Sequence, residues 1–493
     1  MTGPAADARS ERRAWTLAAL AAGAIAFLPF ARIVASGSSF FFRDLSRYFI
    51  PMRLFVLEGL RRGEVRFWNP WDNEGIPLPT MPIGYPLELL QVLWPTAAGI
   101  TVGMALHFPL AALAFVALAR HLGLRPVAAA GGAIAYAIGG FALSMVNLYV
   151  YVHALAWAPL VLWTALRAAD GGRRRLALAA LVCGIALSTT GLELVIQTLI
   201  VAGALCVHPW DVRRLLRVAA SAALGLGLAA PVFTVLGRVT AGTARAAGFS
   251  ADGVLNQSVH PLTFLQVVVG DLYGRLANVT NEWWGGRFFE NGFPYVMSLY
   301  LGAATIALAA AGLASRRPHR RTLAAIAAVA AVVSLGRWVG WMPIVDAVPA
   351  SLRLFRYPTK AFFSIHLVTA LLAAYGLDAV AGGERRALRV LAGCGSAAAV
   401  LLLLAPAGPL VLPGAFASFR TRFFPATVPP DAAAAALDHV SRDAALGGSL
   451  VLLVTLLGWL VLAGRLAGSR AALAAAALVA ADLLRTGAAL NPT

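Results

Sequence analysis

Residues 40–95 read FFFRDLSRYFIPMRLFVLEGLRRGEVRFWNPWDNEGIPLPTMPIGYPLELLQVLWP, a stretch rich in Arg, Trp, Asn, Asp and Pro. The sequence on either side of it is almost entirely apolar. A helix needs about 20 apolar residues to cross a bilayer, and residues 15–36 satisfy that length. We therefore predict that a first membrane-spanning helix ends just before this stretch, and that the stretch forms the first loop.

The whole chain has the composition of a multi-pass membrane protein. Its 493 residues are 60% hydrophobic and 13% charged, whereas a soluble domain carries about 25% charged residues. The net charge of +18 comes from arginine, because Lys360 is the only lysine. In a membrane protein, basic residues gather in cytoplasmic loops and face anionic lipid headgroups. The basic excess therefore indicates membrane lipid as a partner and does not indicate nucleic acid.

Clusters of arginine divide the apolar sequence into about 13 predicted transmembrane helices, so we expect an all-α fold. The positive-inside rule places residues 1–13 in the cytoplasm, a polytopic domain over residues 14–487 in the cell membrane, and residues 488–493 outside. Four longer loops then lie on the outer face, and we expect the chemistry there. They comprise residues 37–95, 240–294, 338–359 and 413–448.

The predicted outer loops are basic, which breaks the positive-inside trend. Arg43 and Arg47 lie in the first loop, and Arg356 and Lys360 lie beside the third. Arginine binds phosphate as a planar fork and lysine as a point charge, so these residues could hold an anionic substrate. The alternative is that they reach toward lipid headgroups at the membrane interface.

Residues 45–62 predict an amphipathic helix that lies in the membrane interface. Pro51 is expected to kink this helix, and Gly63 can end it. Asp44 precedes it, in the position that an N-capping residue would take. No Glu or Gln follows at position 47 to complete a capping box. Asp44 is therefore a candidate catalytic carboxylate as well as a candidate cap.

Residues 68–77, WNPWDNEGIP, predict a rigid polar turn. Trp68 and Asn69 could contact a sugar, because aromatic faces stack on sugar rings, or they could serve the turn alone. Asp72 and Glu74 could help to hold a divalent cation such as Mg²⁺ or Mn²⁺.

Two further carboxylates are candidates for a supporting or cation-binding role. Glu193 follows the turn Thr189–Gly191 between two short apolar segments, and Glu290 lies in an aromatic-rich part of the second loop. An ionisable residue near membrane depth is a functional hypothesis by default, although a solvated turn residue is the alternative. The sequence contains no P-loop, HExxH, CxxC or GxSxG motif.

The order Asp-x-x-x-Tyr-x-x-Pro, Gly, Trp-Asn-Pro, Gly-x-Pro, Tyr-Pro from Asp44 to Pro86 resembles the YfhO family of bacterial membrane proteins, which look like GT-C-type glycosyltransferases. Later motifs are similar as well and make the resemblance span most of the chain. They are Glu290-Asn291, Arg356-Tyr357-Pro358 with Lys360, Gly376-Leu377-Asp378 and Asp482-Leu483-Leu484.

The resemblance implies a GT-C-like fold in the bacterial plasma membrane and an active site on its extracytoplasmic face. Such enzymes transfer a sugar from a polyprenyl-phosphate donor, here to a glycan or lipid acceptor of the cell envelope. A carboxylate of the first outer loop acts as the base, and Asp44 occupies that place. Family members often carry a further outer domain after the last span, and this sequence stops at Thr493.

Two other classes of function compete with the enzyme. A transporter or flippase of lipid-linked sugars would place ionisable residues along a path inside several spans. A non-catalytic envelope assembly protein would have no organised site around Asp44. The gathering of polar residues in the predicted outer loops favours the enzyme.

Overall fold

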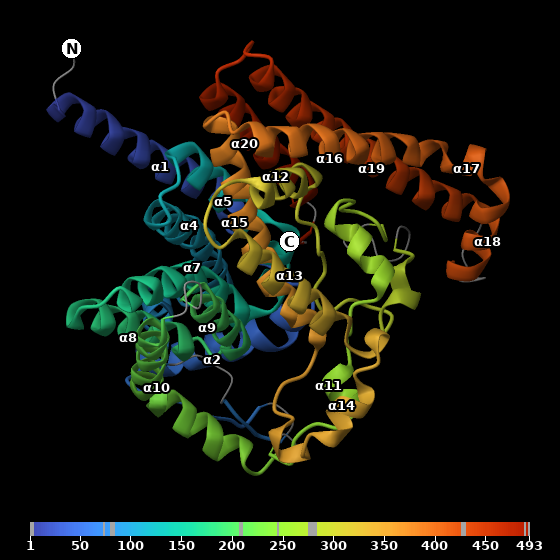
Figure 1. The fold of residues 1–493 in the computed structure, drawn as a ribbon. Coiled ribbons are helices and arrows are strands. Elements are labelled where there is room, and N and C mark those ends of the chain that lie inside the picture. The colour runs from blue at the N-terminus through green and yellow to red at the C-terminus, as the bar shows by residue number, and fades with distance from the viewer. Residues whose placement is uncertain are drawn as a thin grey trace.

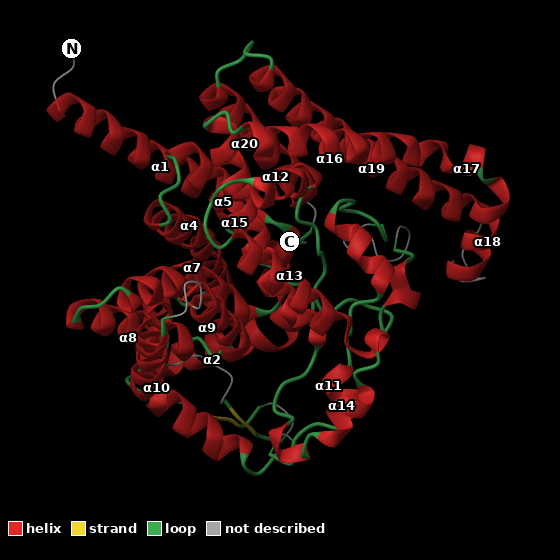
Figure 2. Cartoon of the chain, in the orientation of Figure 1, coloured by secondary structure: helices red, strands yellow, loops and turns green. Residues whose placement is uncertain are grey.

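The structure is a computed structural model that describes residues 4–71, 74–78, 84–206, 211–243, 246–274, 283–424, 430–487 and 490–491. Helices form most of it, and the β-structure within these residues is one two-stranded hairpin (Figure 2). The helices pack into one bundle, from which α16 and α19 extend side by side, with α17 and α18 at their tip (Figure 1).

In the described part of the chain, nine helical segments are long and apolar enough to cross a membrane. The helices that supply them are α1 (Pro4–Ser36), α4 (Ala97–His121), α5 (Pro126–Ile138) with its extension to Asn147, α7 (Tyr149–Ala169), α10 (Val212–Thr240), α13 (Arg320–Leu335), α15 (Phe362–Ala381), α16 (Arg385–Leu404) and α19 (Pro430–Leu462).

Four other helices pack among these nine. They are α8 (Arg173–Ser188), α9 (Leu192–Cys206), α12 (Ala303–Ala314) and α20 (Gly468–Gly487). The prediction of an all-α membrane protein is confirmed. Across the residues that the structure describes, nine candidate spans and the shorter apolar helices α9 and α12 stand against the about 13 spans that we expected from the arginine clusters.

Two segments that we predicted to lie outside the membrane contain helix in the structure. Helix α1 begins at Pro4, inside the segment that we predicted as a cytoplasmic tail. Much of the predicted loop 413–448 is helical, because it contains α18 (Pro413–Phe423) and the first part of α19. Residues 432–436 are five consecutive alanines, and alanine is the strongest helix former. At about 1.5 Å per residue, α19 is longer than the roughly 30 Å hydrocarbon core.

Helix α15 lies at the centre of the bundle, where its apolar window is fully buried. It packs closely against α12 through two glycines. A Cβ atom at Gly312 would lie 1.8 Å from the carbonyl oxygen of Leu372, and one at Gly376 would lie 2.0 Å from that of Leu308. Glycine is therefore required at both positions for the two backbones to approach, as at other close helix crossings in membranes.

An ion-pair cluster joins three elements at the end of α15 that is remote from Lys360. Asp378, near the end of α15, accepts a hydrogen bond from the backbone N–H of Arg125 at 2.9 Å and one from Nε of Arg317 at 3.1 Å. Arg125 precedes α5, and Arg317 lies between α12 and α13. These contacts hold the ends of neighbouring helices together.

The first loop folds into short elements that lie against the bundle. They are η1 (Leu45–Phe49), α2 (Ile50–Arg61), β1 (Trp68–Asn69), β2 (Ile76–Pro77), α3 (Pro86–Leu89) and η2 (Leu90–Leu93). Residues on one side of the η1–α2 helix are buried, whereas Arg47 and Arg61 are exposed, so its amphipathic character is as predicted. Pro51 is the second residue of α2 and directly follows the π-helical turn η1, so it lies where the helix geometry changes. The chain leaves α2 at Gly63, which has a φ of +75°.

A buried ion pair anchors this loop. Arg53 of α2 and Glu88 of α3 are fully buried, and their NH1 and Oε2 atoms lie 3.4 Å apart. Arg53 also donates from Nε to Oε1 of Gln91 at 3.0 Å, and Glu88 accepts a hydrogen bond from the Tyr149 hydroxyl of α7. Burial raises the pKa of Glu88 to about 7, against the opposing charge of Arg53. The pair fixes the position of α2, and therefore of the residues just before it.

Candidate active site

A cavity of about 520 Å³ lies where the first loop meets segments far away in the sequence. Its wall includes the first loop, the beginning of α7, the first turn of α9, the loop after α11 (Ala251–Leu255) and the segment before α15. Among the residues that we singled out from the sequence, Arg43, Asp44, Glu193, Arg356 and Lys360 line it.

Asp44 occupies the residue position before η1, but its side chain makes no capping hydrogen bond. The residue is exposed, and it lines the cavity. The backbone place that suggested an N-cap is therefore correct, whereas the carboxylate is not used for capping. A carboxylate that faces a cavity in this way can accept a proton from a bound hydroxyl group.

Arg43 connects the first loop to the second. Its NH1 atom donates hydrogen bonds to the carbonyl oxygens of Pro294 and Tyr295, both at 3.0 Å, and its guanidinium carbon lies 5.3 Å from the ring centre of Phe293. Burial lowers the pKa of this guanidinium, against the raising effect of the Asp44 charge. These contacts hold Asp44 beside the second loop.

Lys360 and Glu193 form an ion pair in the cavity wall, with Nζ 2.5 Å from Oε1. Their side chains are 12% and 20% exposed, so the pair is largely shielded from solvent. The Lys360 ammonium also lies 5.1 to 5.7 Å from the ring centres of Tyr151, Tyr295 and Tyr357. Aromatic faces attract a cation, so the tyrosines and Glu193 together hold the ammonium at the cavity.

Arg356 presents the second cation of this wall. Its guanidinium carbon lies 4.4 Å from the ring centre of Tyr357 and 5.2 Å from that of Phe249. Within the described residues, no carboxylate forms an ion pair with it. A stacked, half-buried guanidinium without an acidic partner is suited to a phosphate, which it can bind through two parallel hydrogen bonds.

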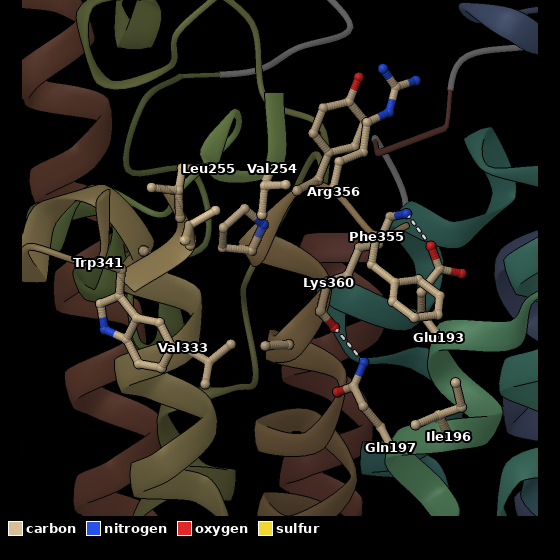
Figure 3. Close-up of a pocket in the computed structure, with 15 residues that line it drawn as sticks. Glu193, Ile196, Gln197, Val254, Leu255, Val333, Trp341, Phe355, Arg356 and Lys360 are labelled. Carbon is tan, nitrogen blue, oxygen red and sulfur yellow. Dashed lines mark hydrogen bonds and ion pairs between the residues drawn. The ribbon is translucent and has the colours of Figure 1, made fainter. Parts of the chain in front are cut away.

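An apolar groove of about 340 Å³ adjoins the cavity (Figure 3). The two share four residues, which are Glu193, Arg356, Tyr357 and Lys360. The rest of the groove is lined mainly by apolar side chains from α9, α11, α13 and the segment 341–361, including Ile196, Leu255, Val333, Trp341 and Phe355. Both cations and Glu193 thus lie between a polar cavity and an apolar groove.

The backbone around the cavity is strained. In the chain as described, six residues other than glycine have a positive φ, and four of them line the cavity. These four are Arg43 (56°), Thr190 (63°), Gln257 (59°) and Tyr357 (70°). Such conformations cost about 1–3 kcal/mol each and gather at functional sites, where the surrounding structure holds side chains in place. Their clustering supports a functional role for this cavity.

The predicted residues of the Trp-Asn-Pro-Trp turn do not line the cavity. Trp68 and Asn69 pair with Pro77 and Ile76 in the hairpin. The Trp68 ring lies over Gly75, and the Asn69 side chain accepts a hydrogen bond from the backbone N–H of Trp71 at 3.1 Å. Both residues therefore serve the turn in this structure.

The remaining candidates are placed in three different ways. Glu74 is exposed on the hairpin, and Asp72 lies outside the described residues. Glu290 accepts a hydrogen bond from the backbone N–H of Gln257 at 2.8 Å and pairs with Nε of Arg337 at 2.6 Å, so it orders the second loop. Arg47 lines a neighbouring hollow together with Asp44.

The cavity offers few carboxylates to a divalent cation. Asp44 and Glu193 are the predicted carboxylates that line the cavity, and Glu193 is already paired with Lys360. The described residues contain no group of three or more His, Cys, Asp or Glu side chains that could hold a metal ion. The cationic side chains of the cavity wall, Arg356 and Lys360, can stabilise negative charge there.

Sequence reasoning missed the aromatic and amide residues of the cavity. Tyr151, Tyr295 and Tyr357 surround Lys360, and Gln257 accepts a hydrogen bond from the backbone N–H of Tyr295 at 3.1 Å. Burial raises the pKa of Tyr295 above its usual value, so its hydroxyl stays neutral beside Lys360. Tyr357 directly follows Arg356 in the Arg356-Tyr357-Pro358 motif. Its position beside a candidate phosphate-binding arginine could have marked it as a residue of the site.

Comparison with known proteins finds no sequence match for this chain. No family model matches the chain, and no curated protein matches it. In structure it is similar to a crystal structure of ArnT from Cupriavidus metallidurans bound to undecaprenyl phosphate, with 15% sequence identity and a TM-score of 0.44. The similarity covers 96% of this chain and 76% of that one. The resemblance to the YfhO family stays a prediction from the quoted motifs.

Proposed function

We propose that this chain is a membrane glycosyltransferase that moves a sugar from a polyprenyl-phosphate donor to an acceptor of the cell envelope, with Asp44 as the general base. One observation carries the proposal. A carboxylate without a capping role, Asp44, shares a cavity with a cationic wall, Arg356 and Lys360, and that wall borders an apolar groove. We place this end of the bundle on the extracytoplasmic face of a bacterial plasma membrane.

The proposed donor fits the order of these surfaces. The isoprenoid chain lies in the apolar groove, because apolar surface is removed from water there. Its phosphate then reaches the shared wall, where Arg356 offers a planar fork and Lys360 a compact charge. Lys360 can exchange the Glu193 carboxylate for a phosphate oxygen, since both are anions within reach of the same ammonium. The sugar extends into the polar cavity toward Asp44.

The chemistry is a single displacement with inversion at the anomeric carbon. Asp44 accepts the proton of the acceptor hydroxyl, and the hydroxyl oxygen forms a bond to the anomeric carbon. The bond between that carbon and the phosphate oxygen breaks, and the polyprenyl phosphate leaves with the electron pair. Arg356 and Lys360 stabilise the negative charge that develops on the leaving group.

Arg356→Gln is expected to weaken the binding of undecaprenyl phosphate by about 10- to 150-fold, because a hydrogen bond to a charged group contributes about 1.5–3 kcal/mol. The measurement is a calorimetric titration of the purified protein in detergent. Arg420→Gln is the matched control, since Arg420 is exposed on α18 and lines none of the cavities described above. Equal affinity of the wild type and Arg356→Gln for undecaprenyl phosphate would show that the phosphate does not bind to Arg356.

One observation would suit a transporter instead. Glu88, His153 and Arg53 form a fully buried ionisable cluster within the bundle. None of these residues lines the cavity, the groove or the neighbouring hollow, so the cluster borders none of these three spaces. We therefore propose an anchoring role for it and keep transport as the outcome to be excluded experimentally.

A further inference from the structure

A second hollow adjoins Asp44. It has a volume of about 560 Å³ and is lined by Phe41, Phe42 and Phe293 together with Arg43, Asp44, Ser46 and Arg47. Arg43 and Asp44 are the two residues that it shares with the polar cavity of about 520 Å³. Asp44 therefore borders two spaces whose other lining residues are different.

The two spaces are not equivalent with respect to the apolar groove. The groove shares four residues with the polar cavity and none with the hollow. A polyprenyl chain in the groove therefore leads its phosphate and sugar into the polar cavity, next to Arg356. The hollow is left free on a second approach to the same carboxylate. A general base needs access from both spaces. It must contact the attacking hydroxyl of the acceptor on one side while that hydroxyl faces the sugar of the donor on the other.

The lining of the hollow indicates the chemistry of its ligand. Three of its seven lining residues are phenylalanines, and Phe41 is 50% exposed only five residues beyond the end of α1. Apolar surface at the end of a membrane-spanning helix is accessible to a molecule held in the bilayer. Arg47 is exposed on the same wall and forms no ion pair within the described residues. Its charge complements an anionic headgroup.

We infer that the hollow between Phe41 and Arg47 binds the acceptor substrate, and that this acceptor is a lipid whose anionic headgroup carries a free hydroxyl. The inference rests on the proposed function, because it assigns the second substrate of the same reaction. The lipid chains contact the phenylalanines, the headgroup anion pairs with Arg47, and the hydroxyl reaches Asp44. Its proton passes to Asp44 as its oxygen replaces the phosphate oxygen on the sugar.

The test measures binding, so it does not depend on turnover. Purified protein in detergent is titrated separately with four ligands. Two are lipids of the same short chain length: phosphatidylglycerol, which has an anionic phosphate and free hydroxyls, and the neutral diacylglycerol. The other two are glycerol 3-phosphate and undecaprenyl phosphate. The variants are Arg47→Gln and Phe41→Ser. Arg61→Gln is the matched control, because Arg61 is exposed on the same helical segment and lines neither space.

Arg47→Gln is expected to weaken phosphatidylglycerol binding about tenfold and to change undecaprenyl phosphate binding less than twofold. Phe41→Ser is expected to weaken phosphatidylglycerol but not glycerol 3-phosphate. Wild-type protein is expected to bind the neutral lipid more weakly than the anionic one, and Arg61→Gln to match the wild type.

Equal phosphatidylglycerol affinity in the wild type and Arg47→Gln would overturn the inference. So would a parallel loss of undecaprenyl phosphate binding, because the two lipids would then share one site. Glycerol 3-phosphate binding as tight as the lipid would assign the hollow to a soluble anion instead. If the binding pattern holds and no sugar is transferred by wild-type protein, the proposed function fails while the lipid site stands.

Discussion

Asp44→Asn is expected to lower the rate of sugar transfer by about 100- to 10,000-fold, the range that a general base contributes. Asparagine has nearly the same shape as aspartate but cannot take the proton of the acceptor hydroxyl. The Asp44 side chain makes no capping hydrogen bond, and its place before η1 tolerates asparagine as a capping residue. The variant should therefore fold normally, bind undecaprenyl phosphate as the wild type does and lose only the chemical step.

The matched control for this substitution is Asp346→Asn. Asp346 is an exposed aspartate in α14 (Met342–Ala347) that lines neither the cavity nor the groove. Steady-state transfer by the two variants and the wild type, at saturating donor, separates a specific effect of Asp44 from a general effect of losing one negative charge. Full transfer activity in Asp44→Asn would show that Asp44 is not the general base.

Arg53→Met is expected to destabilise the protein by about 3–5 kcal/mol, because it leaves the buried Glu88 carboxylate without its cation. Glu88 would keep the hydrogen bond from Tyr149 and the nearby ring of His153, whose Nε2 lies 3.4 Å from Oε1. Since Arg53 connects α2 to α3 and η2, the loss should also loosen the segment that carries Asp44. Thermal unfolding of the purified protein in detergent measures the effect.

The double variant Arg53→Met/Glu88→Gln should recover a large part of that stability, since replacing both partners of a buried pair removes the uncompensated charge. Arg62→Met is the exposed counterpart on the same helix. It breaks the pair of Arg62 with Glu58, whose side chains are 62% and 44% exposed, and it should cost less than about 1 kcal/mol. A double variant no more stable than Arg53→Met would contradict the assignment of the ion pair as the anchor.

Local sequence patterns predicted much of the scaffold. The apolar segments and the arginine clusters gave the helices, and the spacing of apolar residues after Asp44 gave the amphipathic segment up to Gly63. These features depend on hydrophobicity and helix periodicity within short windows, so a single sequence contains them. Residues 413–448 were predicted as an outer loop, and much of this segment is helical because alanine and charged residues can continue a helix beyond the membrane.

The composition of the cavity could be predicted only in part. Asp44, Glu193, Arg356 and Lys360 were each recognised as candidates, but residues more than 140 positions apart meet through tertiary packing that no local pattern encodes. Trp68 and Asn69 were assigned to substrate because aromatic faces stack on sugar rings. The pairing of Trp68 with Pro77 closes that part of the loop on itself, and the turn uses the side chains that we had given to the ligand.

The anchoring pair shows a different limit. Glu88 lies within an apolar run, which was a signal that the carboxylate is buried, whereas Arg53 reads as one of several loop arginines. Burial of Arg53 follows from the way α2 packs on η2 and α4, and it separates Arg53 from Arg61 and Arg62 on the same helix. Charge type alone could not distinguish the structural arginine from the exposed ones.

The most direct test of the account uses proteoliposomes that contain the purified protein and polyprenyl-phosphate-linked sugars, each radiolabelled in the sugar. Both the chemical fate of the label and its side of the bilayer are followed over time. The account predicts that label from one of these donors moves to an acceptor lipid with release of polyprenyl phosphate, and that Asp44→Asn stops this transfer. If the label stays on polyprenyl phosphate and crosses the bilayer, the protein is a transporter and the central claim is wrong.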